Sequence, residues 1–145
     1  MTSNYDELFE RALASQGDAR VQVTRDIDAD GLPERVLVKL HGTVGDPETL
    51  LLGERETLML DRLRPRVWRA LVTELGSATT VMVGSSLRDI SIVRLLEEVG
   101  RKLSGYYVSP RVPLAERRLL ANTGLDAIES DADSFFERLE ADIAR

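Results

Sequence analysis

The chain has 145 residues, 43% of them hydrophobic and 30% charged, which is the size of one folded domain and too apolar for a disordered protein. Its 19 basic and 25 acidic residues give a net charge of −6, which disfavours nucleic acid as a partner. The absence of cysteine excludes disulfides, a thiolate nucleophile and cysteine-bound metal centres.

The sequence also lacks the features of a membrane or secreted protein. No stretch approaches the roughly 18 apolar residues of a membrane-spanning helix. The N-terminal segment MTSNYDELFERAL carries acidic residues where a signal peptide carries basic residues and then an apolar run. We therefore expect a cytoplasmic protein with no membrane contact, in keeping with the lack of cysteine.

Helix and strand patterns alternate along the first part of the chain. Apolar residues at helical spacing predict a helix over residues 5–15, with Asn4 as its N-cap. Residues 21–24 and 35–40 have the pattern of short strands, and the aspartates, glycine and proline between them predict a hairpin or a loose loop.

The rest of the chain continues this alternation. Residues 54–75 predict an interrupted helix, with Pro65 in the first turn of its second part. The continuous apolar run of residues 79–83 is typical of a strand buried on both faces. The elements expected after it are a helix over residues 89–103, a strand over 106–109, a helix over 113–122, a strand over 125–128, and a helix capped by Asp131 that ends at Ile143.

This order of elements determines the expected fold. Strands that alternate with helices form parallel sheets with right-handed crossovers. We expect an α/β protein with a Rossmann-like three-layer sandwich and a mostly parallel sheet. Residues 1–145 are expected to form a single domain, because no internal repeat or linker divides the sequence.

Three polar clusters lie at places where such a fold binds ligands, beyond the carboxyl ends of the strands. Residues 4–6 open the first helix, and His41 and Gly42 follow the second strand. Residues 84–86, Gly-Ser-Ser, join the third strand to a helix, where backbone amides and the helix dipole suit a phosphate or a ribose. Each cluster also has a plainer interpretation, as a helix cap, a core histidine or a tight turn.

Taken together and in this order, these segments resemble bacterial sirtuin-like (Sir-two-like) domains. MTSNYDELFERAL is similar to the family segment T-x-N-Y-D-x-L-h-E-x-A, and VLVKLHGTV to the strand that carries its His-Gly pair. TTVMVGSSLRDISIVRLL is similar to the strand, turn and helix that face the nicotinamide dinucleotide. GLDAIESDADSFFERL resembles the closing strand and helix, so the resemblance covers residues 2–139.

The resemblance implies that NAD is the substrate. Asn4 matches the asparagine that orients the nicotinamide ring or an attacking water, and His41 matches the catalytic histidine beside the nicotinamide ribose, a general base. Asp6 would hold the first loop in place. The other cofactor-binding positions that the resemblance implies are Gly42, Gly84, Ser85, Ser86 and Asp89, the last of which caps the following helix. The implied reaction cleaves the nicotinamide glycosidic bond through an oxocarbenium-like transition state.

Two departures from the family pattern shape this expectation. Deacylase sirtuins insert a four-cysteine zinc module after the His-Gly pair, whereas residues 43–83 contain no cysteine. Hydrolysis of NAD is therefore favoured over protein deacylation, and no metal is expected. The family also begins upstream, with a strand and a G-A-G-x-S loop that cradles the pyrophosphate, so we expect a partial domain whose sheet has an open edge.

Three accounts of this open edge remain. The gene is truncated or its start is mispredicted, a partner chain or a second copy completes the sheet, or the domain has given up catalysis. A completed domain is expected to be an NAD⁺ hydrolase (NADase) related to bacterial anti-phage effectors. The alternative is a catalytically silent binding or scaffold module.

Other signals have ordinary structural interpretations. The segment DIDADG at residues 26–31 imitates a calcium loop, but Leu37 stands at position twelve where the loop needs glutamate, which favours a solvated loop. The four arginines between residues 62 and 69 favour a solvated helix face over a nucleic-acid site. Trp68 and the phenylalanine pair at residues 135–136 are expected in the core.

Overall fold

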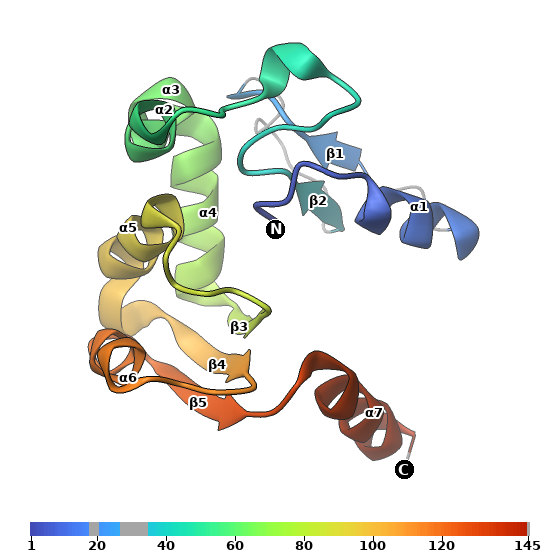
Figure 1. Ribbon diagram of the computed structural model, residues 1–145, viewed down its shortest axis with the longest axis vertical. Helices are drawn as coiled ribbons and strands as arrows, with labels where there is room; N and C mark the ends of the chain where they lie inside the picture. The colour runs from blue at the N-terminus through green and yellow to red at the C-terminus, as the bar shows by residue number, and fades with distance from the viewer. Residues whose placement is uncertain (18–20, 27–34, 145) are drawn as a thin grey trace. The chain divides into compact units, whose positions relative to one another are not determined.

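The computed structural model describes residues 1–17, 21–26 and 35–144, which form two compact units, Met1–Leu71 and Val72–Arg145 (Figure 1). Each unit contains parallel strands and helices, so the α/β fold class is confirmed.

The first unit is built on short parallel strands. β1 (Val21–Val23) pairs with β2 (Val36–Val38), so the expected hairpin is wrong, because a hairpin joins antiparallel strands. On the other side of β2, Thr2 forms a parallel bridge to Lys39. The Thr2 amide donates to the Val38 carbonyl at 2.8 Å, and the Leu40 amide donates to the Thr2 carbonyl at 2.9 Å. The N-terminal residues thus continue the sheet beside β2.

Helices complete the first unit. Their bounds are α1 (Leu8–Ser15), the 3₁₀ turn η2 (Pro47–Thr49), α2 (Glu54–Leu58), α3 (Leu60–Leu63) and α4 (Pro65–Ser77), which crosses the unit boundary in sequence. Pro65 opens α4, as expected. The carboxylate of Asp26 accepts the backbone N–H groups of Arg66 and Val67 at 2.7 and 3.1 Å, which satisfies free donors in the first turn of α4. Trp68 in this helix is buried, as predicted.

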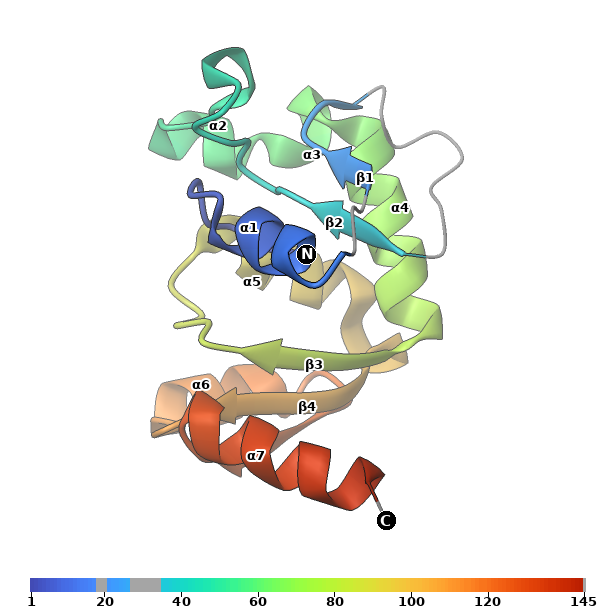
Figure 2. The same ribbon diagram turned by 90° about the vertical axis from the view of Figure 1, so that its right-hand side faces the viewer.

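The second unit is a three-stranded parallel sheet with helices on both faces. The strands are β3 (Thr79–Val83), β4 (Ser104–Ser109) and β5 (Leu125–Glu129), in the order β3-β4-β5. The helical elements are α5 (Ile90–Val99), the 3₁₀ turn η3 (Gly100–Lys102), α6 (Leu114–Leu120) and α7 (Ala132–Ile143). Figure 2 shows α7 in front of this sheet and α5 and α6 behind it, which makes three layers.

Local signals explain where the helices of this unit begin and end. Asp131 caps α7 as predicted, because its carboxylate accepts the Ser134 amide at 2.9 Å. α5 ends before residue 103, because Gly100 has a φ of +58°, a left-handed conformation that favours glycine and stops a helix.

Two burial predictions for this unit are wrong. β3 is not buried on both faces, since it lies at the edge of the described sheet and Val81 is 45% exposed. Phe136 is also exposed, although its ring packs edge-on against Phe135 at a centroid distance of 5.3 Å. In both cases the apolar sequence pattern is present, but no described element covers that face of the residue.

Candidate functional site

A sharp turn after β2 carries His41 and Gly42, and residues 40–43 are called the histidine turn below. Gly42 has a φ of +89°, and a Cβ atom at this position would collide with the carbonyl group of Thr49. Only glycine therefore fits here without strain. The imidazole-bearing residue His41 is buried, and its carbonyl accepts the Leu51 amide at 3.0 Å. The close approach of two backbone segments thus fixes the histidine turn.

Residues 2–7, called the first loop, lie against the histidine turn. The Tyr5 and His41 ring centroids are 6.0 Å apart. The Tyr5 hydroxyl donates to the Leu51 carbonyl at 2.8 Å, and the Tyr5 carbonyl accepts the Val44 amide at 2.9 Å. The structure therefore brings the segment that carries Asn4 next to the segment that carries His41.

Asn4 is not the N-cap of the first helix, and this prediction is wrong. α1 begins at Leu8, whose amide donates to the Asp6 carboxylate at 3.0 Å. The backbone N–H of Asn4 instead donates to the Thr2 hydroxyl at 3.1 Å, and Asn4 is exposed. The first loop is longer than the periodicity predicts, because the turn at residues 6–7 precedes the helix.

A buried lysine lies beneath the first loop. The Lys39 side chain is fully buried, and its ammonium lies 3.0 Å from the Glu10 carboxylate and donates to the Asp6 carbonyl. A buried ammonium is costly unless partners compensate for its lost hydration. Lys39 therefore ties the sheet to α1 and to the first loop. Sequence reasoning missed this role, although a lone lysine in the apolar strand sequence VLVKL is a visible signal.

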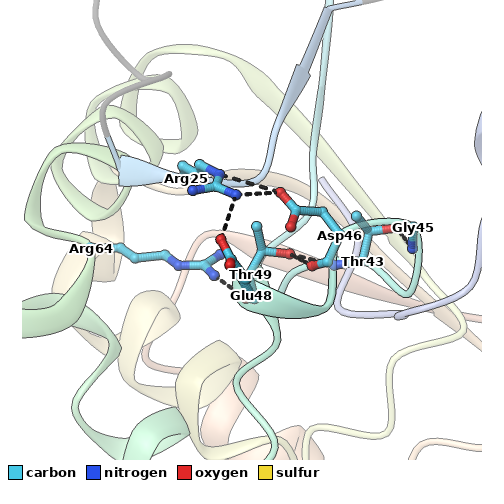
Figure 3. A network of polar contacts seen from close by, with 7 residues as sticks. All are labelled: Arg25, Thr43, Gly45, Asp46, Glu48, Thr49 and Arg64. Atoms are coloured by element: carbon cyan, nitrogen blue, oxygen red, sulfur yellow. Dashed lines mark hydrogen bonds and ion pairs between the residues drawn. The ribbon is translucent and has the colours of Figure 1, made fainter.

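Arg64 is a second buried cation, so a solvated helix face is the wrong expectation for this residue. Its guanidinium donates to the Lys39 and Leu40 carbonyls at 3.3 and 3.1 Å. It also donates to the Thr49 carbonyl, and Figure 3 shows Arg64 beside Thr49. Arg64 lies in the break between α3 and α4, where it is not part of a helix face. Burial lowers the pKa of the Arg64 guanidinium, and the negative charge of Asp26 partly offsets this effect.

A polar network holds the loop that follows the histidine turn. The Thr49 hydroxyl donates to the Asp46 carbonyl at 2.6 Å and accepts the Thr43 amide at 3.1 Å (Figure 3). Arg25, which follows β1 in the chain, pairs with the Asp46 carboxylate at 2.6 Å and lies 3.5 Å from the Glu48 carboxylate. These ion pairs are exposed and contribute little stability, so the buried contacts of Thr49 and Arg64 carry most of the support.

The second unit carries the serine turn, residues 84–87, at the carboxyl end of β3. Gly84 and Leu87 both have left-handed backbone conformations, with φ of +70° and +46°. The carboxylate of Asp89 accepts the Ser91 amide at 3.0 Å and the Ser91 hydroxyl at 2.6 Å, and it caps α5. The serine turn, in which Gly84 and Ser86 are exposed, therefore leads into a capped ten-residue helix.

The described residues offer no metal site and no membrane span. In residues 1–17, 21–26 and 35–144, no group of three or more His, Asp or Glu side chains is placed to hold a metal ion. Asp26 of the calcium-like segment caps α4, while Asp28, Asp30 and Gly31 lie outside the described residues. No helix in the described part of the chain is long and apolar enough to cross a membrane.

A comparison with family models shows what kind of domain the chain resembles. The model described as SIR2-like domain matches residues 1–128, which confirms the resemblance to sirtuin-like domains. No curated protein matches the chain. The matched range contains the first loop, the histidine turn and the serine turn. Domains of this kind generally bind NAD.

Proposed function

Because the chain belongs to the SIR2-like domain family, we propose that it binds NAD and hydrolyses it to nicotinamide and ADP-ribose. The observation that supports this proposal best is the contact between the first loop and the histidine turn. This contact holds the candidate residues Asn4 and His41 on adjacent segments. His41 is the only histidine of the chain, and histidine is the side chain best suited to general base catalysis near neutral pH.

In the proposed reaction, the C–N bond between the ribose and the nicotinamide ring breaks. Its electron pair leaves with nicotinamide, which departs as a neutral molecule, and the ribose carbon gains oxocarbenium character. Water adds to this carbon, and His41 accepts the released proton, directly or through a ribose hydroxyl. Asn4 orients the nicotinamide or the water. Such a reaction depends on positioning and charge stabilisation, which the two constrained segments supply.

The serine turn is the proposed contact for the rest of the dinucleotide. Gly84, Ser85 and Ser86 offer amides and hydroxyls in the turn that precedes α5, and the N-terminus of a helix favours phosphate groups. Asp89 would keep this helix start in place through its contacts with Ser91. Gly42 and Asp6 would act in the same way on the first unit, by fixing the histidine turn and the first loop.

We predict a cytoplasmic bacterial protein with a role in defence against phage, and a single sirtuin-like domain over residues 1–145. We also predict that the sheet edge associates with a second copy or a partner chain. The absence of cysteine makes the zinc module of deacylases impossible, which keeps protein deacylation the least favoured activity.

The test is nicotinamide release from NAD by the purified chain, measured by chromatography. We expect His41→Ala and Asn4→Ala to lower the rate by about a hundredfold or more. The matched control is Asn122→Ala, another exposed asparagine, which should leave the rate unchanged. Thermal melting shows whether each variant is folded. A wild-type chain that releases no nicotinamide, or a folded His41→Ala variant with full activity, would overturn the hydrolase proposal and favour a catalytically silent binding module.

A further inference from the structure

Tyr107 lies directly beneath the serine turn. Tyr107 is 0% exposed, and its hydroxyl donates to the Ser85 carbonyl at 2.6 Å. The carboxylate of Glu116 lies 3.1 Å from the same oxygen, as a second acceptor. The adjacent Tyr106 is 43% exposed and points to the opposite face of the sheet, because side chains alternate along a strand. Of the two tyrosines, only Tyr107 reaches the turn.

The Ser85 carbonyl determines the direction of the next amide. All peptide bonds of the described chain are trans, so the Ser85 carbonyl and the Ser86 N–H point in opposite directions from one planar unit. The hydrogen bond to Tyr107 turns the carbonyl toward the core of the unit. The Ser86 N–H therefore points outward from the turn, and Ser86 is exposed.

The backbone of this turn needs such support. Leu87 has a φ of +46°, which is unfavourable for a side chain with a Cβ atom and persists only where the surroundings hold it. Leu87 is buried, which fixes one end of the turn. Gly84, at the other end, has no side chain that could be packed in this way, and no atom lies within 4 Å of its Cβ position. The Tyr107 hydroxyl contacts Ser85, the residue next to this glycine.

We propose that Tyr107 is a positioning residue for the dinucleotide, whose hydroxyl fixes the Ser85 carbonyl inward and thereby aims the Ser86 amide at an oxygen acceptor of bound NAD. This inference rests on the proposed function, because it assigns the serine turn to the ligand. The role is specific to the hydroxyl group, since the ring of Tyr107 fills the core whether or not the oxygen is present. Removal of the oxygen alone should free the peptide unit between residues 85 and 86 to rotate.

The test compares Tyr107→Phe with Tyr106→Phe in the full chain. ADP-ribose affinity is measured by calorimetry, and the orientation of the turn is followed through the Ser86 amide signal in ¹H–¹⁵N NMR spectra. We expect Tyr107→Phe to shift the Ser86 signal and to weaken ADP-ribose binding about fivefold, the effect of one lost hydrogen bond. Tyr106→Phe should match the wild type in both measurements.

A third variant separates positioning from stability. Leu125→Val shortens a buried side chain at the amino end of β5, so it lowers the melting temperature without touching the serine turn. It should leave both the Ser86 signal and the ADP-ribose affinity unchanged, because a loss of stability alone does not reorient the serine turn.

Each result is decisive. An unshifted Ser86 signal in Tyr107→Phe overturns the proposal, and so does unchanged ADP-ribose affinity in that variant. If the wild-type chain binds no ADP-ribose, the proposed function fails together with the ligand part of this inference, and the NMR comparison alone decides whether Tyr107 orients the turn.

Discussion

In the unit Met1–Leu71, buried cations hold the segments that carry Asn4 and His41, whereas in Val72–Arg145 a neutral hydroxyl and a helix cap hold the serine turn. A buried cation destabilises the fold strongly once a partner is lost, while loss of a neutral hydrogen bond costs less. The histidine turn should therefore be rigid and intolerant of substitution. The serine turn should tolerate substitution better than the histidine turn.

The largest effect is expected at Arg64. Arg64→Met leaves the carbonyls of Lys39, Leu40 and Thr49 without their charged donor, and we expect a loss of about 3–4 kcal/mol of unfolding free energy. Urea unfolding measures this loss. The exposed Arg62→Met is the matched control and should change stability by less than about 0.5 kcal/mol. Equal stabilities of the two variants would show that buried charge does not support the histidine turn.

The second largest loss of stability is expected at Lys39. Lys39→Met leaves the buried Glu10 carboxylate unpaired, so we expect a loss of about 3 kcal/mol in urea unfolding. The added change Glu10→Gln removes the unpaired charge and should restore part of this stability. A double variant less stable than Lys39→Met alone would contradict an ion pair between these residues.

The two turn glycines give the sharpest contrast between the units. Gly42→Ala introduces a clash with the Thr49 carbonyl group in addition to a left-handed backbone, and we expect a loss above about 2 kcal/mol. Gly84→Ala meets no atom within 4 Å, so only the backbone strain of about 1 kcal/mol remains. Urea unfolding of both variants measures the two losses. A larger loss for Gly84→Ala than for Gly42→Ala would contradict the difference between the two turns.

A smaller effect concerns the ionisation of Tyr107. Burial, and next the charge of Glu116, raise the pKa of Tyr107 from 10.0 to about 12. The folded state therefore holds this proton more tightly than the unfolded state. The resulting stability is present below pH 10 and is lost as the pH rises through about 12. Ultraviolet titration should show one late tyrosine, absent from Tyr107→Phe. A late tyrosine that persists in this variant would contradict the assignment.

The smallest effect is expected at the exposed cap of α7. The Ser134 backbone N–H, and next its hydroxyl, lower the pKa of Asp131 from 3.8. The charged cap thus stabilises the fold above pH 3.8, and this contribution is lost as the pH falls through the lowered pKa. The melting temperature of the wild type should fall more between pH 7 and pH 3 than that of Asp131→Asn. Equal falls would show that the cap is not coupled to folding.

The sequence predicts elements best where the determining signals are local. β3 to β5 and α7 lie within a few residues of their predicted bounds, because apolar runs and the caps Asp89 and Asp131 act over one turn of chain. The parallel pairing of β1 and β2 was missed, since it depends on the path of the chain between the strands.

The supports of the candidate site were harder to predict. Arg64 and Arg62 have the same kind of sequence neighbourhood, yet of the two only Arg64 is buried. Arg64 lies in a helix break, where its side chain donates to the backbone carbonyls that follow β2. Tyr106 and Tyr107 are adjacent residues of the same type. The alternation of side chains along β4 decides which of them reaches the serine turn. Motifs therefore indicate the candidate residues, while the groups that hold them depend on tertiary contacts.

The most direct test of the central claim uses His41 itself. Since it is the only histidine, the chain has a single imidazole signal in NMR spectra. The ligand is an NAD analogue in which carbon replaces the ring oxygen of the nicotinamide ribose, so that it is not cleaved. We predict that the imidazole signal shifts and saturates as this analogue is added. A signal that does not move while the protein remains folded would contradict an NAD site at the histidine turn.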